Sequence, residues 1–330
     1  MLLRNHGLIL PRVILLIFIT LWQGISVSAA EVVIVSSSEA TPYAMTQKAL
    51  ESELGKHGHI SQVISLAELR DKTMSIVPSE AKVVIAVGTQ AATWLHPQVK
   101  PPQHLVYCMV SDPIEAGLHK EPLITGVSTQ VPIKGQFQLI QEALPKVRTL
   151  GMLYHTTTDK EKSLLKSIRE QLPEGWRLEA VAIDQYKTVA QAIAELFGRK
   201  IDIIWTEPDA LIYKRATVRT LLLTALRKNV PVFGYSAGFV KAGGLLGIAI
   251  DPDTQARQAI DIVERFLHEE NPSTGTHNSE TQENWQKARY EIALNLIVAE
   301  QLSITFPQEL LKRAKYVFKP QGNNDKEKSK

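Results

Sequence analysis

Cysteine is almost absent from this 330-residue sequence, in which Cys108 is the only one. A single cysteine cannot form an intramolecular disulfide bond, so the fold must be stabilised by its apolar core. The residues around it, at positions 105–110, are apolar or aromatic. We therefore predict that Cys108 lies in a buried strand and that its thiol is not reactive.

The sequence also has a small net charge and few long apolar runs. The formal net charge is only +3, and a near-neutral surface argues against nucleic acid or an anionic membrane as the main partner. The apolar run at 13–22 has about ten residues, whereas a membrane-spanning helix needs about twenty. This run is therefore too short to predict a membrane span.

The first thirty residues have the order of a secretory signal peptide. Arg4 and Arg12 precede the apolar run, and small residues follow it at 26–30. We predict cleavage after Ala29 or Ala30 and a periplasmic mature protein, with an uncleaved N-terminal anchor as the alternative. The absence of a cysteine near the cleavage point argues against a lipoprotein anchor.

Short runs rich in β-branched residues alternate with helical patterns in the rest of the chain. Strands are predicted at 32–35, 83–87, 105–110, 150–154, 178–183, 201–205 and 230–235. Helices are predicted at 43–57, 134–144, 160–172, 189–197, 211–228 and 252–268. Because strands alternate with helices and several strands are apolar throughout, the pattern predicts an α/β fold with doubly wound parallel sheets.

This series runs twice, at 31–125 and at 148–240, and about 300 mature residues exceed one core of about 100–150 residues. We expect two lobes joined by a hinge. Lobe 1 would hold residues 31–125 plus about 250–275, and lobe 2 residues 126–249 plus about 285–318. Residues 319–330 are charged and predicted to be disordered.

A side-chain oxygen precedes proline at four predicted junctions, where it can cap the following helical turn. The junctions are Thr41-Pro42, Asp112-Pro113, Glu207-Pro208 and Asp251-Pro252. In parallel sheets such junctions lie at the carboxyl edge, where ligands bind.

Polar groups at these strand ends suit a zwitterionic ligand. The hydroxyls of Ser37, Ser38 and Thr89, with the backbone at Gly88, could bind a carboxylate. The carboxylates of Asp112, Glu207, Asp209 and Asp251 could bind an ammonium group. Aromatic residues at or beside the same ends suggest a pocket with flat walls: Tyr43, Tyr107, Tyr154, Trp205 and Tyr235.

Across essentially the whole mature chain, the sequence resembles the bacterial ABC-transporter substrate-binding proteins whose better-known members bind aromatic amino acids. The resemblance rests on VVIAVGTQAA at 83–92, VSDPIEAGL at 110–118, ITGVS at 124–128, LPKVR at 144–148, GMLY at 151–154, VPVFG at 230–234, YEIALNL at 290–296 and FPQELL at 306–311. It implies a type I periplasmic-binding fold whose lobes close on a small ligand. It also implies ligand-facing positions at Ser37 to Tyr43, Gly88-Thr89, Ser111-Asp112, Tyr154-His155, Thr206 to Asp209, Tyr235-Ser236 and Asp251.

The resemblance further implies an ABC permease of the inner membrane as the partner. A membrane sensor is the alternative partner, because either needs only to distinguish open from closed lobes. We expect a monomer that uses no cofactor and has no enzymatic activity.

Two sequence patterns suggest other functions. Residues 234–238 fit the G-x-S-x-G nucleophile elbow of serine hydrolases, with Ser236 as nucleophile, Asp251 or Asp253 as the acid and His268 or His277 as the base. Glycines at 243–244 disfavour the long helix that this elbow requires. His57-Gly58-His59 could be a metal-binding pair, but its place beside glycine favours an exposed turn, so no metal is expected.

Overall fold

The computed structural model describes residues 30–71, 77–119, 123–156, 159–209, 211–268 and 284–320. The predicted signal peptide up to residue 29, residues 321–330 of the predicted tail, and His277 lie outside this part. No helix in the described part combines the length and apolar composition that a membrane span requires.

Lobe 1 is built on a parallel sheet with the strand order β11-β5-β4-β3-β1-β2. Its strands are β1 (Val32–Ser36), β2 (Ser61–Ser65), β3 (Val83–Val87), β4 (His104–Val110), β5 (Ile124–Ser128) and β11 (Trp285–Gln286). Its helices are α2 (Thr41–Lys56), α3 (Leu66–Arg70), α4 (Thr89–Leu95) and α10 (Pro252–His268). Every residue of β1 and β3 is buried, because α2 and α10 cover one face while α3 and α4 cover the other.

Lobe 2 is built on a second sheet with the order β13-β12-β10-β9-β8-β6-β7. Its strands are β6 (Thr149–Tyr154), β7 (Arg177–Ala182), β8 (Ile203–Trp205), β9 (Val232–Gly234), β10 (Leu246–Ala249), β12 (Glu291–Asn295) and β13 (Tyr316–Phe318). Its helical segments are α5 (Ile133–Ala143), α6 (Asp159–Gln171), the 3-10 turn Ile183–Gln185, α7 (Val189–Gly198), α8 (Arg215–Arg227), α9 (Ala237–Lys241), α11 (Leu296–Gln301) and α12 (Gln308–Arg313). The strands are parallel except at the β10–β12 pair.

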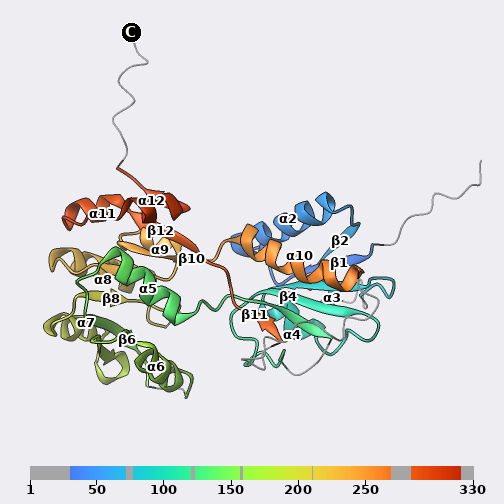
Figure 1. The fold of residues 1–330 in the computed structure, drawn as a ribbon. Helices are drawn as coiled ribbons and strands as arrows, with labels where there is room; N and C mark the ends of the chain where they lie inside the picture. The colour runs from blue at the N-terminus through green and yellow to red at the C-terminus, as the bar shows by residue number, and fades with distance from the viewer. Residues whose placement is uncertain are drawn as a thin grey trace, which may run out of the picture.

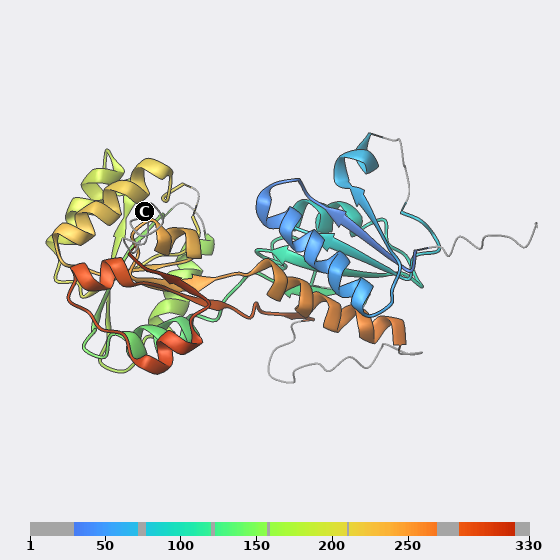
Figure 2. The same cartoon turned by 90° about the horizontal axis from the view of Figure 1, so that it is seen from above.

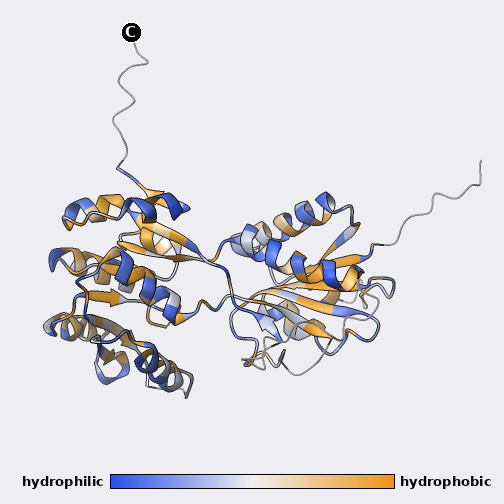
Figure 3. Ribbon diagram, in the orientation of Figure 1, coloured by the Kyte–Doolittle hydropathy of each residue, from blue (hydrophilic) through white to orange (hydrophobic). Residues whose placement is uncertain are grey.

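The described chain crosses between the lobes three times, after β5, after β10 and after β11. Figures 1 and 2 show these crossings as the narrow link between two separate sheets. Strand β10 runs toward the link and β12 runs away from it, which explains why this pair is antiparallel. Figure 3 shows the apolar strands at the centre of each lobe, with hydrophilic residues on the outer helices.

The predicted α/β architecture is confirmed, and α10 has the bounds expected for it. The predicted lobe boundary between 125 and 126 falls inside β5, which pairs with β4 as far as Ser128. Strand β11 pairs with β5, so lobe 2 resumes after Gln286 rather than at 285. The helix expected at 211–228 begins at Arg215.

Cys108 is buried in β4, as predicted, and burial raises the pKa of its thiol to about 12. A thiol with so high a pKa stays protonated at neutral pH, which removes the nucleophilic thiolate form. The lone cysteine is therefore a packing residue.

Candidate functional site

The carboxyl edges of both sheets point toward the opposite lobe. Strand β5 leads directly into the crossing to α5, so the carboxyl ends of all strands parallel to it point toward lobe 2. Strand β10 leads into α10, which packs against α2 of lobe 1. The carboxyl ends of β6 to β10 therefore point toward lobe 1. Ligand sites of open α/β sheets lie at such edges.

Three predicted residues of lobe 1 are in direct contact at this edge. Gly88 follows β3 with φ +92, and a Cβ added to it would lie 2.6 Å from Ser37 Oγ and 2.8 Å from Tyr43 Cε1. Only glycine adopts this conformation without strain and leaves room for both neighbours. The Ser37 hydroxyl accepts a hydrogen bond from the backbone N–H of Ala91 at 2.9 Å, which leaves its own O–H to donate.

The other predicted residues of lobe 1 follow neighbouring strands. Thr89 is the half-buried first residue of α4, and Ser38 is exposed, with its hydroxyl accepting from the N–H of Ala40 at 3.3 Å. Ser111 is exposed at the end of β4. Asp112 Oδ1 accepts from the backbone N–H groups of Ile114 at 3.1 Å and Glu115 at 3.0 Å. This carboxylate thus has a fixed position at the sheet edge.

In lobe 2, half-buried Tyr154 ends β6 and is followed by buried His155. The His155 Nε2 atom lies 3.8 Å from Asp209 Oδ1, which is too long for a hydrogen bond, and it has no hydrogen-bond partner in the described part of the chain. Asp209 Oδ1 accepts from the N–H groups of Leu211 at 2.7 Å and Ile212 at 2.9 Å. A buried imidazole nitrogen without a partner is an unusual feature that suits ligand contact.

An aromatic cluster lies beside this pair. The ring centroids of Tyr213 and Tyr235 are 5.7 Å apart, and those of Tyr235 and Phe239 are 5.1 Å apart. Burial raises the pKa of Tyr235, and the nearby Asp209 charge raises it further. The Tyr213 hydroxyl is buried without a hydrogen-bond partner in the described residues, and burial, followed by the charge of Asp209, raises its pKa above the ordinary range.

The remaining predicted residues of lobe 2 have mainly local roles. The Thr206 hydroxyl is buried and donates to the carbonyl of Phe233 at 2.8 Å. Ser236 Oγ accepts from the N–H of Phe239 at 3.1 Å and caps α9. Glu207 is half-buried at the end of β8.

Asp251 lies in the crossing between β10 and α10, and its contacts differ from the expected ligand role. Its carboxylate accepts from Tyr316 Oη at 2.7 Å, and Lys315 Nζ lies 2.7 Å from it. The N–H and hydroxyl of Thr254 each bind it at 3.0 Å. Both carboxylate oxygens are therefore engaged by protein groups at this crossing, and the ligand role of Asp251 stays a prediction.

The expected helix caps are confirmed at Asp112 and Asp251. At Thr41 the expectation is wrong, because Thr41 is the first residue of α2 and Ala40 is its N-cap, without a side-chain hydrogen bond. After β8 the oxygen that binds the next turn belongs to Asp209. Proline therefore predicted the start of a helical turn more accurately than it predicted which side chain caps that turn.

Two of the predicted wall aromatics belong to the cores. Trp205 is fully buried, and its indole N–H donates to Gln136 Oε1 at 2.9 Å. Tyr107 is fully buried against Gly126. Conversely, no role was predicted for Tyr213, whose N–H donates to the carbonyl of Asp209 four residues earlier. The position of Tyr213 close to acidic and aromatic residues in the sequence was the one feature that could have indicated such a role.

The structure does not bring Ser236 and His268 together, as a hydrolase triad would require. Ser236 lies in lobe 2, whereas His268 ends α10 on lobe 1, where it pairs with Glu264 at 3.1 Å. Asp251 is engaged by the hinge contacts. His277 lies outside the described residues.

Surface hollows of the individual lobes lie elsewhere. One borders Tyr186 and Gln191 of lobe 2, and another lies between α2 and α10 beside His57 and Arg257. The predicted ligand residues instead form two groups, one at each facing sheet edge.

Comparison with known proteins places this arrangement in a family. Residues 50–318 match the model of the ABC transporter substrate binding proteins. The chain belongs to this family. Its members are extracellular or periplasmic proteins that bind small molecules and deliver them to an ABC transporter.

Individual relatives agree with this assignment. A tyrosine-binding protein of Clostridioides difficile (strain R20291) is 24% identical over 197 residues, which cover 58% of this chain and 56% of that protein. The alignment thus spans little more than half of the relative's length.

Solved structures show the same two-lobed fold, which is the type I periplasmic-binding fold. The ligand-free, open form of a substrate-binding protein with adhesive properties from Clostridium difficile has a TM-score of 0.71 at 19% identity, covering 88% of this chain and all of that one. An ABC domain from Streptococcus pneumonia in complex with L-Trp has a TM-score of 0.57 at 21% identity, covering 87% of this chain and all of that one. These relatives and neighbours are substrate-binding proteins rather than enzymes.

Proposed function

We propose that this protein is the periplasmic substrate-binding component of an ABC importer and that it captures a zwitterionic, amino-acid-like ligand between its lobes without changing it chemically. The observation that carries the proposal is the pair of facing carboxyl edges, each with fixed polar groups. We further propose that the signal peptide is cleaved after Ala29 or Ala30 and that the permease of the inner membrane is the partner.

Lobe 1 provides the groups for the carboxylate of the ligand. The Ser37 hydroxyl oxygen accepts a hydrogen bond from the N–H of Ala91, and its O–H can therefore donate to a ligand oxygen. The Thr89 hydroxyl is the second candidate donor, since Thr89 follows Gly88 at the start of α4, whereas the N–H of Gly88 itself donates to the carbonyl of Cys108 at 2.8 Å. Bonds from several neutral donors suit a carboxylate, because its oxygens accept several hydrogen bonds at once.

Carboxylates from both lobes provide the ammonium site. Asp112 is fixed on lobe 1 by two backbone N–H groups, while Asp209 and Glu207 follow β8 on lobe 2. A cation bound between lobes 1 and 2 would interact better with closed lobes than with open ones. Such differential binding is what drives a ligand-induced closure.

The ring cluster of lobe 2 favours a ligand with a flat apolar part. Tyr235 is half-buried after β9 and packs against Tyr213, and Tyr154 ends β6, which is separated from β9 by β8. Aromatic walls with a few oriented polar groups are typical of small-molecule sites. The tyrosine and tryptophan bound by the two relatives have this chemistry.

We propose that the lobes close when the ligand binds. Ile114 and Leu211, apolar residues just beyond β4 and β8, are exposed, and closure would shield them from water.

A thermal-shift screen followed by calorimetry tests the proposal. A ligand that binds only the folded protein raises its melting temperature, and L-tyrosine and L-tryptophan are the first compounds to screen, followed by other amino acids, nucleobases and organic acids. Failure of every compound that carries both an ammonium and a carboxylate would overturn the ligand class.

The role of Asp112 is tested with the ligand so found. Asp112→Asn keeps an oxygen for the two backbone N–H groups but removes the charge, so binding should weaken by about 1.5–3 kcal/mol, or roughly 10- to 150-fold. Glu115→Gln, an equal charge change in the same turn, is the control and should bind as the unchanged protein does. Equal affinity of the Asp112 variant and the unchanged protein would remove Asp112 from the site.

A further inference from the structure

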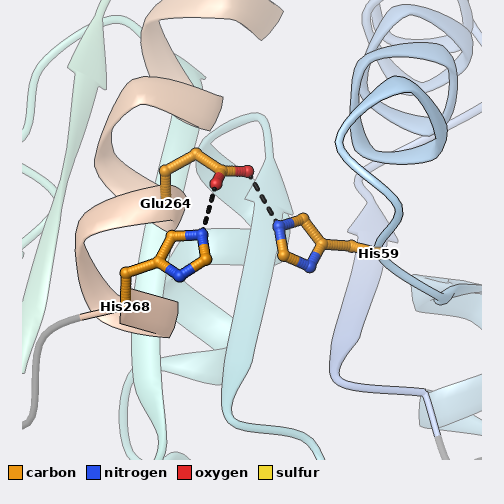
Figure 4. A group of neighbouring side chains, drawn as sticks. All are labelled: His59, Glu264 and His268. Atoms are coloured by element: carbon orange, nitrogen blue, oxygen red, sulfur yellow. Dashed lines mark hydrogen bonds and ion pairs between the residues drawn. The ribbon is translucent and has the colours of Figure 1, made fainter.

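Three histidines converge on one carboxylate at the end of lobe 1 that lies away from the hinge. His59 Nε2 lies 2.9 Å from Glu264 Oε1, and His268 Nε2 lies 3.1 Å from Glu264 Oε2. Figure 4 shows the two rings on either side of this carboxylate. His57 Nδ1 lies 3.3 Å from Glu264 Oε1. The expectation of an exposed turn holds for His57, whose side chain is 46% exposed, but is wrong for His59, which is 10% exposed.

The fold brings these residues together from distant parts of the sequence. His57 and His59 follow α2 and precede β2, while Glu264 and His268 lie one turn apart near the end of α10. Helices α2 and α10 pack together on the same face of the sheet. The cluster therefore lies at the amino edge of the sheet, opposite the proposed ligand site.

We propose that His59, Glu264 and His268 bind a divalent transition-metal ion of the zinc class. One ligand atom from each of the three residues lies within 4.8 Å of the others. Zinc–nitrogen and zinc–oxygen bonds of about 2.0–2.1 Å place tetrahedral ligands about 3.3 Å apart. The contacts of His59 and His268 to Glu264, at 2.9 and 3.1 Å, are already close to that spacing.

The chemistry of the ligands selects the ion. Imidazole nitrogen with a single carboxylate suits zinc and its neighbours, whereas calcium and magnesium prefer sites made of oxygen alone. The ring nitrogens that now lie within hydrogen-bond distance of Glu264 are the atoms that zinc would bind, so the same side chains serve with or without the ion.

A supporting contact behind His59 has the form seen at metal centres. The second ring nitrogen, Nδ1, lies 3.5 Å from Glu31 Oε2, and Lys82 Nζ holds Oε1 of that residue at 2.8 Å. Metal-bound histidines almost always use their other ring nitrogen to contact a carboxylate, a carbonyl or water, which orients the ring. This arrangement favours Nε2 of His59 as the metal-binding atom.

Metal binding would tie two outer elements of lobe 1 together. The His59–Glu264 contact joins residues 205 positions apart in the sequence. A bound ion would therefore add stability to lobe 1, and it would leave ligand capture at the opposite edge unchanged. The failure of this proposal and that of the proposed function can thus be distinguished.

The test uses the purified protein without a polyhistidine tag. Calorimetric titration with Zn²⁺ should give one ion per chain, and Zn²⁺ should raise the melting temperature. Binding of Co²⁺, followed by its visible absorption, reports coordination by nitrogen. His268→Ala is the decisive variant, because this side chain is 70% exposed and its loss should not disturb folding.

The variants have graded expected effects. Loss of a supporting carboxylate, as in Glu31→Gln, weakens metal binding by roughly 10- to 100-fold, so loss of a direct ligand in His268→Ala should weaken it at least as much. His96→Ala is the matched control, because His96 ends α4 on the opposite face of the sheet, and it should bind Zn²⁺ normally. Absence of Zn²⁺ binding in the unchanged protein, or equal binding by the His268 and His96 variants, would overturn the proposal.

Discussion

Asp251 offers the sharpest test of how the hinge is held. Burial alone would raise the pKa of this carboxyl group, but hydrogen bonds from Lys315 and Tyr316, with further bonds from Thr254, outweigh it and lower the pKa from 3.8 to about 2. The Asp251 side chain is only 6% exposed, so solvent screens these contacts little. The ionised form is thus strongly preferred in the folded protein.

The size and sign of the effect follow from this shift. Each pKa unit corresponds to about 1.4 kcal/mol, so a shift of nearly two units contributes about 2 kcal/mol to the free energy of unfolding at neutral pH. Because the folded-state pKa is lowered, the contribution is fully present above the unfolded pKa of about 4. It is lost as the pH falls from about 4 toward about 2.

Asp251→Asn removes the charge while keeping the shape, and urea denaturation followed by circular dichroism measures the result. The variant should lose about 2 kcal/mol at pH 7, and the difference from the unchanged protein should shrink between pH 4 and pH 3. Asp261→Asn is the control, because Asp261 is 60% exposed and its ion pair with Arg289 spans 4.0 Å. It should change stability by less than about 0.5 kcal/mol. A loss in the Asp251 variant that is the same at pH 7 and pH 3 would refute the assigned role of its charge.

Two further substitutions test the packing and the site. Gly126→Ala would put a Cβ 2.2 Å from the carbonyl oxygen of Tyr107, so thermal unfolding should show a loss of stability of at least about 1–3 kcal/mol. Gly55→Ala on α2 is the control, because no atom lies within 4 Å of the added Cβ, and it should be tolerated or stabilising. Equal effects of the two substitutions would contradict the packing argument. Tyr213→Phe removes a buried hydroxyl without a hydrogen-bond partner in the described residues, so stability should stay within about 1 kcal/mol, while the affinity for an amino-acid ligand should fall if the hydroxyl binds it. A large loss of stability would show instead that the hydroxyl is bonded within the protein.

The architecture was accessible from the sequence because it is encoded in long, regular patterns. The run at 83–87 is apolar throughout, and it forms β3 with the predicted bounds. The apolar positions of 252–268 recur at helical spacing, and α10 has the same bounds. Strand β13 has only three residues, which is too short for a repeating apolar pattern to be recognised. Its position in the sheet is set by its pairing with β12, which is distant in the sequence.

The side-chain contacts were less accessible, because they depend on residues that are close only in the fold. In the sequence, Asp251 is one of several carboxylates at predicted strand ends. Only the fold brings Lys315 and Tyr316, at the start of β13, into contact with it. His59 resembled a residue of an exposed turn, and only the packing of α10 against α2 gives it Glu264 as a partner. Local sequence could not specify either partner.

The contacts of Asp251 also limit how the lobes can move. Helix α10 packs on lobe 1 along α2, yet Asp251, the residue that precedes it, is bound to the β13 segment of the lobe 2 sheet. A rotation of one lobe relative to the other must therefore pivot near this contact or break it. A pivot near this contact would keep the bonds from Lys315 and Tyr316 to Asp251, and the crossings after β5 and β11 would then absorb the larger displacement.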